Sequence, residues 1–169
     1  LLEIDGRRYV FVDTAGIRRR SKIDDRLESF AVYRAIRTIE KCHIVLLMID
    51  GVEGITNQDA RLANLISQRG RGCILLINRW DLVKQMPERN VHVLRDEIEQ
   101  SLPHLSWAPT LYMSAKSGKG THRIIPLVHE VYQEFNKRIS TSKVNNFLKD
   151  VVEHYPPPQK HHHRVIVQK

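Results

Sequence analysis

The chain has 169 residues, a formal net charge of +8 and a hydrophobic fraction of 41%. This hydrophobic fraction is usual for a globular protein, so the composition excludes a wholly disordered chain and predicts one domain, or one domain and part of a second. No apolar run approaches the ~20 residues of a membrane helix, so no membrane partner is expected. Because Leu1-Leu2-Glu3-Ile4-Asp5 has no Met and no signal peptide, we interpret the chain as a fragment of a longer protein.

The first elements expected are a hairpin, a basic loop and a helix. Asp5-Gly6 divides residues 1–12 into two short alternating runs, which indicates a tight β-hairpin. The second strand runs into residues 13–16, Asp-Thr-Ala-Gly. The polar, basic stretch 17–26 is expected to form a loop, and the apolar spacing over 28–40 predicts a helix.

Strands and helices alternate through the middle of the chain. The apolar runs 43–49 and 73–77 predict strands buried on both faces of a parallel sheet, and 110–113 predicts a third strand. This alternation predicts an α/β fold with a doubly wound, mostly parallel sheet. Helices are expected from the cap Thr56 to Gly70, from Pro87 to about Ser101, and from Thr121 to Lys137 with Pro126 early in it.

The pattern changes near residue 139, where a second domain is expected to begin. Ser140 or Thr141 can cap a helix that runs through His154, and the prolines 156–158 end it. The run 164–168 begins a strand, and the chain ends too soon to complete this domain.

The two cysteines and the charge indicate the setting of the protein. Cys42 and Cys73 lie beside apolar runs, and we interpret both as small core residues in a reducing cytosol. The net charge of +8 favours an anionic partner, for which RNA is the natural candidate.

A motif that can read guanine follows the run 73–77. In Asn78-Arg79-Trp80-Asp81, the Asp81 carboxylate can accept two parallel hydrogen bonds, and guanine offers two adjacent donors, its ring N–H and its amine. Adenine has an acceptor in place of that ring N–H, so such a site can discriminate by about 10⁴-fold. The motif therefore predicts GTP or GDP as the ligand.

Two further motifs follow expected strands. Asp13-Thr14-Ala15-Gly16 lies where open α/β sheets bind ligands, so Asp13 can hold Mg²⁺ through water and Gly16 can bring its N–H close to a terminal phosphate. Ser114-Ala115-Lys116 can direct backbone N–H groups toward the guanine oxygen. A Gly-rich phosphate loop does not occur in the sequence.

These three motifs resemble the third, fourth and fifth motifs of translation-factor-related GTPases. Residues 13–20, Asp-Thr-Ala-Gly-Ile-Arg-Arg-Arg, and 78–81 look like the second G domain of the EngA/Der family. That family consists of bacterial GTPases with two tandem G domains and a C-terminal KH-like domain, which act in large ribosomal subunit assembly. Residues 138–143 and 154–158 are similar to the family's entry into the KH-like domain. The resemblance implies an N-terminally truncated P-loop GTPase G domain over 1–138 and the start of an α+β KH-like domain over 139–169.

The resemblance also implies a cytoplasmic, ribosome-associated and monomeric GTPase whose partners are GTP or GDP and large-subunit rRNA. Ile17 stands where many GTPases place a water-orienting Gln, which implies a potassium-assisted reaction with Mg²⁺. Gly16 would sense the γ-phosphate and Asn78 would brace the pocket loops, but without the P-loop we expect this chain not to hydrolyse GTP. The predicted nucleotide-binding residues are Asp13, Thr14, Ala15, Gly16, Ile17, Asn78, Arg79, Trp80, Asp81, Ser114, Ala115 and Lys116.

Two positions depart from the family pattern. Arg79 stands where the family has Lys, whose stem covers the base and whose amine supports the phosphate loop. Arg can also stack on a base, but its planar fork is not equivalent to an ammonium, so an altered nucleotide affinity is expected. Ser21 replaces a Gly and is expected to stiffen the loop.

Several alternatives stay open. The basic cluster of residues 18–26 is either a solvated loop or a contact, controlled by nucleotide state, for rRNA phosphates or for the KH-like domain. His161–His163 alternate between the two faces of a strand, which favours a loop interior to a domain over a metal site. For the whole protein, the rival interpretations are a non-catalytic RNA-binding or ribosome-docking module with a degenerate GTPase shell, and an Era- or MnmE-like GTPase.

Overall fold

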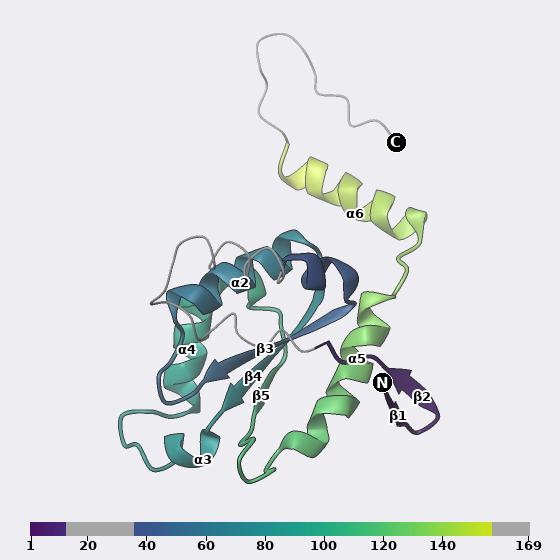
Figure 1. Cartoon of the computed structure of the whole chain (residues 1–169). Coiled ribbons are helices and arrows are strands. Elements are labelled where there is room, and N and C mark those ends of the chain that lie inside the picture. The colour runs from purple at the N-terminus through teal and green to yellow at the C-terminus, as the bar shows by residue number, and fades with distance from the viewer. Residues whose placement is uncertain (13–35, 157–169) are drawn as a thin grey trace. The chain divides into compact units, whose positions relative to one another are not determined.

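The computed structural model describes residues 1–12 and 36–156, which form parts of two compact units, Leu1–Phe135 and Asn136–Lys169 (Figure 1). The predictions made for the Asp13–Ile17 motif, the basic cluster 18–26, the first part of the helix 28–40 and the histidines 161–163 lie outside the described residues. The end of that helix is present, because residues 36–41 are helical.

The chain begins with the predicted hairpin, formed by β1 (Leu2–Ile4) and β2 (Arg7–Tyr9). Its turn residues Asp5 and Gly6 both have positive φ angles, 50° and 71°, as a two-residue turn with a right-handed strand twist requires. The second strand ends at Tyr9 instead of residue 12. Residues 10–12 pair with no strand in the described part of the chain, and their side chains are exposed.

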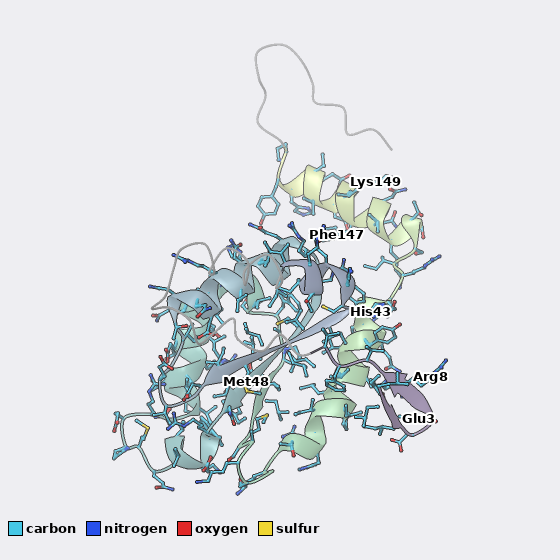
Figure 2. The ribbon with its side chains drawn as sticks, in the orientation of Figure 1. Glu3, Arg8, His43, Met48, Phe147 and Lys149 are labelled. Atoms are coloured by element: carbon cyan, nitrogen blue, oxygen red, sulfur yellow. The ribbon has the colours of Figure 1, made fainter. Side chains whose placement is uncertain are left out.

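The hairpin also brings opposite charges together. Glu3 and Arg8, both labelled in Figure 2, are register partners on neighbouring strands. Such a cross-strand pair of opposite charges favours this register over its alternatives.

The main sheet consists of three parallel strands in the order β3 (Ile44–Asp50), β4 (Gly72–Asn78) and β5 (Thr110–Tyr112). Asp50 is the register partner of Asn78, and Ile77 is the register partner of Tyr112. All three strands therefore end at one edge of the sheet, where open α/β sheets bind their ligands. The predicted strands are confirmed to within about a residue at each end.

Helices cover both faces of this sheet, as Figure 1 shows, and the predicted α/β class is confirmed. Residues of α2 (Asn57–Gln68) and α4 (Val91–Ser101) share a core with one face, and α5 (Ile124–Phe135) packs on the other. The elements that the sequence did not predict are α3 (Trp80–Val83) and the short 3₁₀ turn η1 (Pro103–Leu105). The helix predicted from Thr121 begins as a 3₁₀ turn, η2 (Thr121–Arg123), and continues as α5.

The helix starts follow from local hydrogen bonding. Thr56 Oγ1 accepts the N–H of Asp59 at 3.3 Å while Asp59 Oδ2 accepts the N–H of Thr56 at 3.0 Å, which confirms Thr56 as the cap of α2. Asn90 caps α4, so this helix begins four residues after Pro87. In α5, Pro126 is the third residue, where its missing N–H removes no intrahelical bond.

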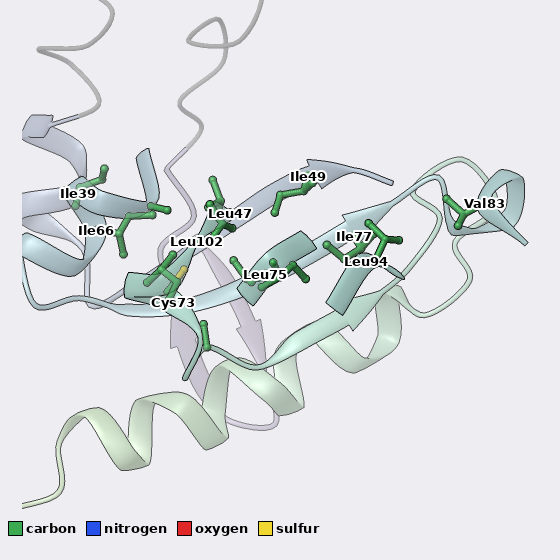
Figure 3. Close-up of a cluster of buried hydrophobic side chains, with 14 residues drawn as sticks. Ile39, Leu47, Ile49, Ile66, Cys73, Leu75, Ile77, Val83, Leu94 and Leu102 are labelled. Carbon is green, nitrogen blue, oxygen red and sulfur yellow. The ribbon is translucent and has the colours of Figure 1, made fainter. Parts of the chain in front are cut away.

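Strand β4 forms the centre of the hydrophobic core (Figure 3). Cys73, Leu75 and Ile77 belong to the cluster with α2 and α4, whereas Ile74 and Leu76 belong to the cluster with α5. Because β4 has a strand on each side and helices on each face, the prediction that it is buried on both faces is confirmed. Complete burial also raises the pKa of the Cys73 thiol to about 12.

Strand β3 differs from the prediction of burial on both faces. Leu47 and Ile49 are buried against α2, but Met48 on the opposite face is 43% exposed (Figure 2). The side chains of α5 reach Ile44 and Leu46 at the start of the strand. In the described sheet β3 is an outer strand, so the last residues of this strand are covered on one face only.

The second unit contains α6 (Thr141–His154), which matches the predicted helix with Ser140 as its cap residue. The Ser140 side chain makes no capping hydrogen bond. One side of α6 carries exposed apolar residues, with Phe147 at 66% (Figure 2). None of the helices in residues 36–156 combines the length and the apolar character needed to cross a bilayer.

Candidate functional site

The carboxyl ends of β3 and β4 are tied closely together. The N–H of Gly51, directly after β3, donates to the carbonyl of Asn78 at 2.9 Å. A Cβ atom at Gly51 would lie 2.9 Å from that same carbonyl oxygen and 2.9 Å from Cγ2 of Val83, so only glycine fits without displacement. This close approach fixes where Asn78 presents its side chain.

Asn78 joins two of the predicted motifs. Its Oδ1 accepts the N–H of Ala115 at 2.9 Å, and the N–H of Trp80 donates to the carbonyl of Met113 at 3.1 Å. The loop after β4 and the loop after β5 are therefore held side by side at the edge of the sheet.

The loop after β5 is closed by its own hydrogen bonds. Ser114 is buried, its N–H donates to the carbonyl of Lys119 at 2.9 Å, and its Oγ accepts the N–H of Ser117. The N–H groups of Ser114 and Ala115 are thus already engaged. Among the described residues the N–H of Lys116 donates to no acceptor, so of the three N–H groups in this motif it is the one not already engaged.

Arg79 makes the sharp turn into α3. Its backbone is left-handed, with φ 62° and ψ 28°, and its carbonyl accepts the N–H groups of Leu82 and Val83 at 2.9 and 3.2 Å. A non-glycine residue in this conformation costs on the order of 1 kcal/mol, which the surrounding hydrogen bonds must offset. The turn places Asp81, whose side chain is half-buried, in the first turn of α3.

Asp50 is a site residue that the sequence interpretation missed. Arg79 Nη1 donates to Asp50 Oδ2 at 2.9 Å, so the guanidinium is held by the end of the neighbouring strand. Burial alone would raise the pKa of the Asp50 carboxyl, but the hydrogen bonds from Arg79 and from the N–H groups of Val52 and Glu53 lower it overall. The signal was present: an Asp directly after a buried strand lies at the ligand-binding edge of the sheet.

Trp80 faces the protein instead of the nucleotide edge. Its ring packs against Tyr112 with centroids 4.4 Å apart, and both side chains border the core. Trp80 therefore packs below this corner of the sheet. Trp107 lies elsewhere and donates its Nε1–H to the carbonyl of His104.

A cavity of about 460 Å³ opens beside this corner, between α3 and the end of β5. It shares Trp80, Asp81 and Ser114 with the predicted site, while the basic residues Lys119 and Arg123 are exposed at its rim. The other lining residues are Lys84, Tyr112, Met113, Gly120 and His122.

The phosphate and metal part of the predicted site was assigned to residues 13–17, outside the described residues. Within residues 1–12 and 36–156, no group of three His, Cys, Asp or Glu side chains is placed to hold a metal ion. The structure therefore describes the base-reading half of the predicted site: Asn78, Arg79, Asp81 and the loop 114–116.

An open parallel sheet whose strand ends carry an Asn-x-x-Asp corner bonded to a Ser-Ala-Lys loop defines the class of GTP-binding domains. The model of the elongation factor Tu GTP binding domain matches residues 2–157, and the chain belongs to this family. A crystal structure of a probable GTP-binding protein engB has the same fold, with a TM-score of 0.53 and 16% identity over 66% of this chain and 70% of its own.

More specifically, the chain is similar to proteins named GTPase Der. It is 43% identical over 154 residues to the protein of Caldanaerobacter subterraneus subsp. tengcongensis and 42% identical over 153 residues to that of Thermoanaerobacter sp. strain X514. Each match includes 90% of this chain but 35% of the relative, so the chain spans about a third of the length of these curated relatives. The predicted resemblance to the EngA/Der family is confirmed by these relatives.

Proposed function

We propose that this chain supplies the guanine-binding part of a GTPase. The observation that carries the proposal is the 2.9 Å hydrogen bond from the Ala115 N–H to Asn78 Oδ1. It joins the segment that bears the Asp81 carboxylate to the loop that bears the Lys116 N–H. A purine that offers two donors to the former and an oxygen to the latter is guanine, whereas adenine reverses this pattern.

The remaining assignments extend this proposal to the nucleotide phosphates. Asp13 is the residue proposed to hold Mg²⁺ through water, and Gly16 the residue proposed to contact the γ-phosphate, with Thr14, Ala15 and Ile17 beside them. The ion would neutralise phosphate charge during transfer. Potassium remains part of the proposal through the EngA/Der resemblance alone.

For the whole protein, we propose GTP hydrolysis that drives a conformational switch during assembly of the large ribosomal subunit. Support comes from the relatives named GTPase Der and from the net charge of +8, which suits an rRNA partner. In this proposal residues 1–138 are G domain and 139–169 open a KH-like domain, the protein is cytoplasmic and monomeric, and the present chain alone does not hydrolyse GTP.

The substitution Asp81→Asn in the full-length protein tests the base-reading role. The amide would lose one acceptor for guanine and gain a donor for the C2 carbonyl of xanthine. We expect GDP affinity to fall at least about 100-fold and XDP affinity to rise, as measured by calorimetric titration. Asp96→Asn, the same chemical change at an exposed position of α4, serves as the matched control and should bind GDP like the unmodified protein.

Two results would contradict the proposal. Unchanged GDP affinity in the Asp81→Asn variant would remove Asp81 from the base-reading role. Binding of rRNA without any nucleotide binding by the unmodified protein would favour the rival interpretation, a docking module with a degenerate GTPase shell.

A further inference from the structure

The Asp50 carboxylate is oriented by the backbone that follows it. Its Oδ1 accepts the N–H of Val52 at 2.9 Å and that of Glu53 at 3.3 Å, which closes an Asx turn at the end of β3. One oxygen is thereby committed to the turn. The other, Oδ2, is the one that accepts Arg79 Nη1 at 2.9 Å.

The turn that carries Asp50 is itself held by Glu97 of α4 and by Arg89, which lies just before that helix. Arg89 Nη1 donates to the carbonyl of Gly51 at 2.7 Å, and Glu97 Oε1 accepts the N–H of Ile55 at 2.8 Å. Arg89 and Glu97 also form an ion pair at 3.6 Å, and the side chains of both are largely buried. The turn that anchors Arg79 is therefore itself held by hydrogen bonds to Arg89 and Glu97.

Arg79 is constrained at its backbone as well as at its tip. Its left-handed φ of 62° sets the direction of the side chain, and the ion pair with Asp50 sets the position of the guanidinium. The side chain nevertheless remains 47% exposed, next to Asn78 and two residues before Asp81. A guanidinium bonded at its edge in this way keeps its planar face available, and such faces stack on nucleobases.

We propose that Asp50 is a positioning residue for the nucleotide base, because it holds the Arg79 guanidinium as a flat platform on which the purine ring stacks. This inference rests on the proposed guanine-binding function and adds a residue and a contact to it. Asp81 reads the edge of the base, whereas the platform contacts its face. Since every purine has the same kind of face, the contribution of Asp50 to affinity is independent of which purine is bound.

The test uses Asp50→Asn, Arg79→Ala and the double variant in the full-length protein. In Asp50→Asn the side-chain oxygen still accepts the N–H groups of Val52 and Glu53, but the amide turns donors toward the guanidinium, so the turn is retained and the anchor is lost. We expect about a threefold to tenfold loss of GDP affinity in Asp50→Asn. The double variant should bind GDP no more weakly than Arg79→Ala, because Asp50 acts only through Arg79.

A second arm separates positioning from recognition of the base edge. In the Asp81→Asn background, Asp50→Asn should weaken XDP binding by the same factor by which it weakens GDP binding in the unmodified protein. Asp96→Asn serves again as the matched control, and thermal unfolding without nucleotide verifies that each variant is folded. Should Asp50→Asn fail to fold, Arg79→Ala alone tests the platform from its other end, with the same range of loss expected.

Three results would overturn the inference: unchanged GDP affinity in folded Asp50→Asn, unchanged GDP affinity in Arg79→Ala, or the same loss from Asp50→Asn with and without the Arg79 side chain. These results differ from a failure of the proposed function. In that case the unmodified protein would bind no GDP, or Asp81→Asn would leave its preference for guanine intact. If Asp81→Asn changes the base preference while Asp50 and Arg79 do not matter, the function stands and the platform alone is wrong.

Discussion

Strands β3 and β4 are neighbours of equal length, seven residues each, and both are rich in Ile and Leu. Their surroundings nevertheless differ. Strand β4 has a partner on each side and is buried along its whole length except for Asn78, whereas β3 is an outer strand of the sheet formed by the described residues, with Met48 exposed. The comparison teaches that burial is set by the position of a strand in the sheet and not by its composition.

The same contrast extends into the site. Asn78, at the end of the enclosed strand, has its carbonyl and its side-chain oxygen both committed to backbone N–H groups. Asp50, at the end of the outer strand, holds a side chain, Arg79, that is still half exposed. The corner thus combines a part fixed by the core with a part held by an ion pair near solvent.

The largest expected effect separates the two strands by stability. Leu75→Ala on β4 should lower the free energy of unfolding by about 2–5 kcal/mol, because it leaves a cavity in the fully buried core. Met48→Ala on β3 should cost less than about 1 kcal/mol, because that side chain is already 43% exposed. Urea unfolding of the full-length protein measures both. Equal losses would show that β3 is as enclosed as β4 in the intact protein.

A smaller effect is expected from the end of β4. Asn78→Ala removes the acceptor of the Ala115 N–H, which should cost about 1–2 kcal/mol of stability and weaken GDP binding at least about tenfold, because the two loops separate. Asn90→Ala is the matched control, since Asn90 Oδ1 also accepts backbone N–H groups, at the start of α4. It should cost about 1 kcal/mol and leave GDP affinity unchanged. Equal binding losses in both variants would make Asn78 merely structural.

The smallest expected effect concerns the two thiols. Burial raises the pKa of Cys73 on β4 to about 12, and it also raises that of Cys42, which is only half-buried before β3. Because the folded-state pKa of Cys73 lies above the ordinary 9.0, the contribution of its neutral thiol to the free energy of unfolding is complete below pH 9. This contribution is lost as the pH rises toward 12. Near pH 8 a thiol reagent should label Cys42 first and Cys73 only on unfolding. Labelling at equal rates would contradict the enclosed position of β4.

The sequence predicted those parts of the fold whose cause is local. The apolar run before Asn78 indicated β4, Asp5-Gly6 indicated the hairpin, and Thr56 with Asp59 indicated the start of α2. Adjacency of the loops after β4 and β5 also followed, because parallel strands end at one edge of a sheet.

What could not be predicted depends on contacts between elements. The four residues of α3 are too few to show a helical period, and the left-handed backbone of Arg79 has no sequence signal in a residue other than Gly, Asn or Asp. The pairing of Arg79 with Asp50 links residues 29 positions apart. The sequence pattern also shows that Met48 is an apolar residue within a strand. It does not show whether another element covers its side chain.

The tight approach at Gly51 has a mechanical consequence. The space beyond its Cα is occupied by the Asn78 carbonyl on one side and by Val83 of α3 on the other. The turn after β3 therefore cannot move toward β4 without contacting Val83 of α3. Displacement of this turn toward β4 would therefore press on the short helix that carries Asp81.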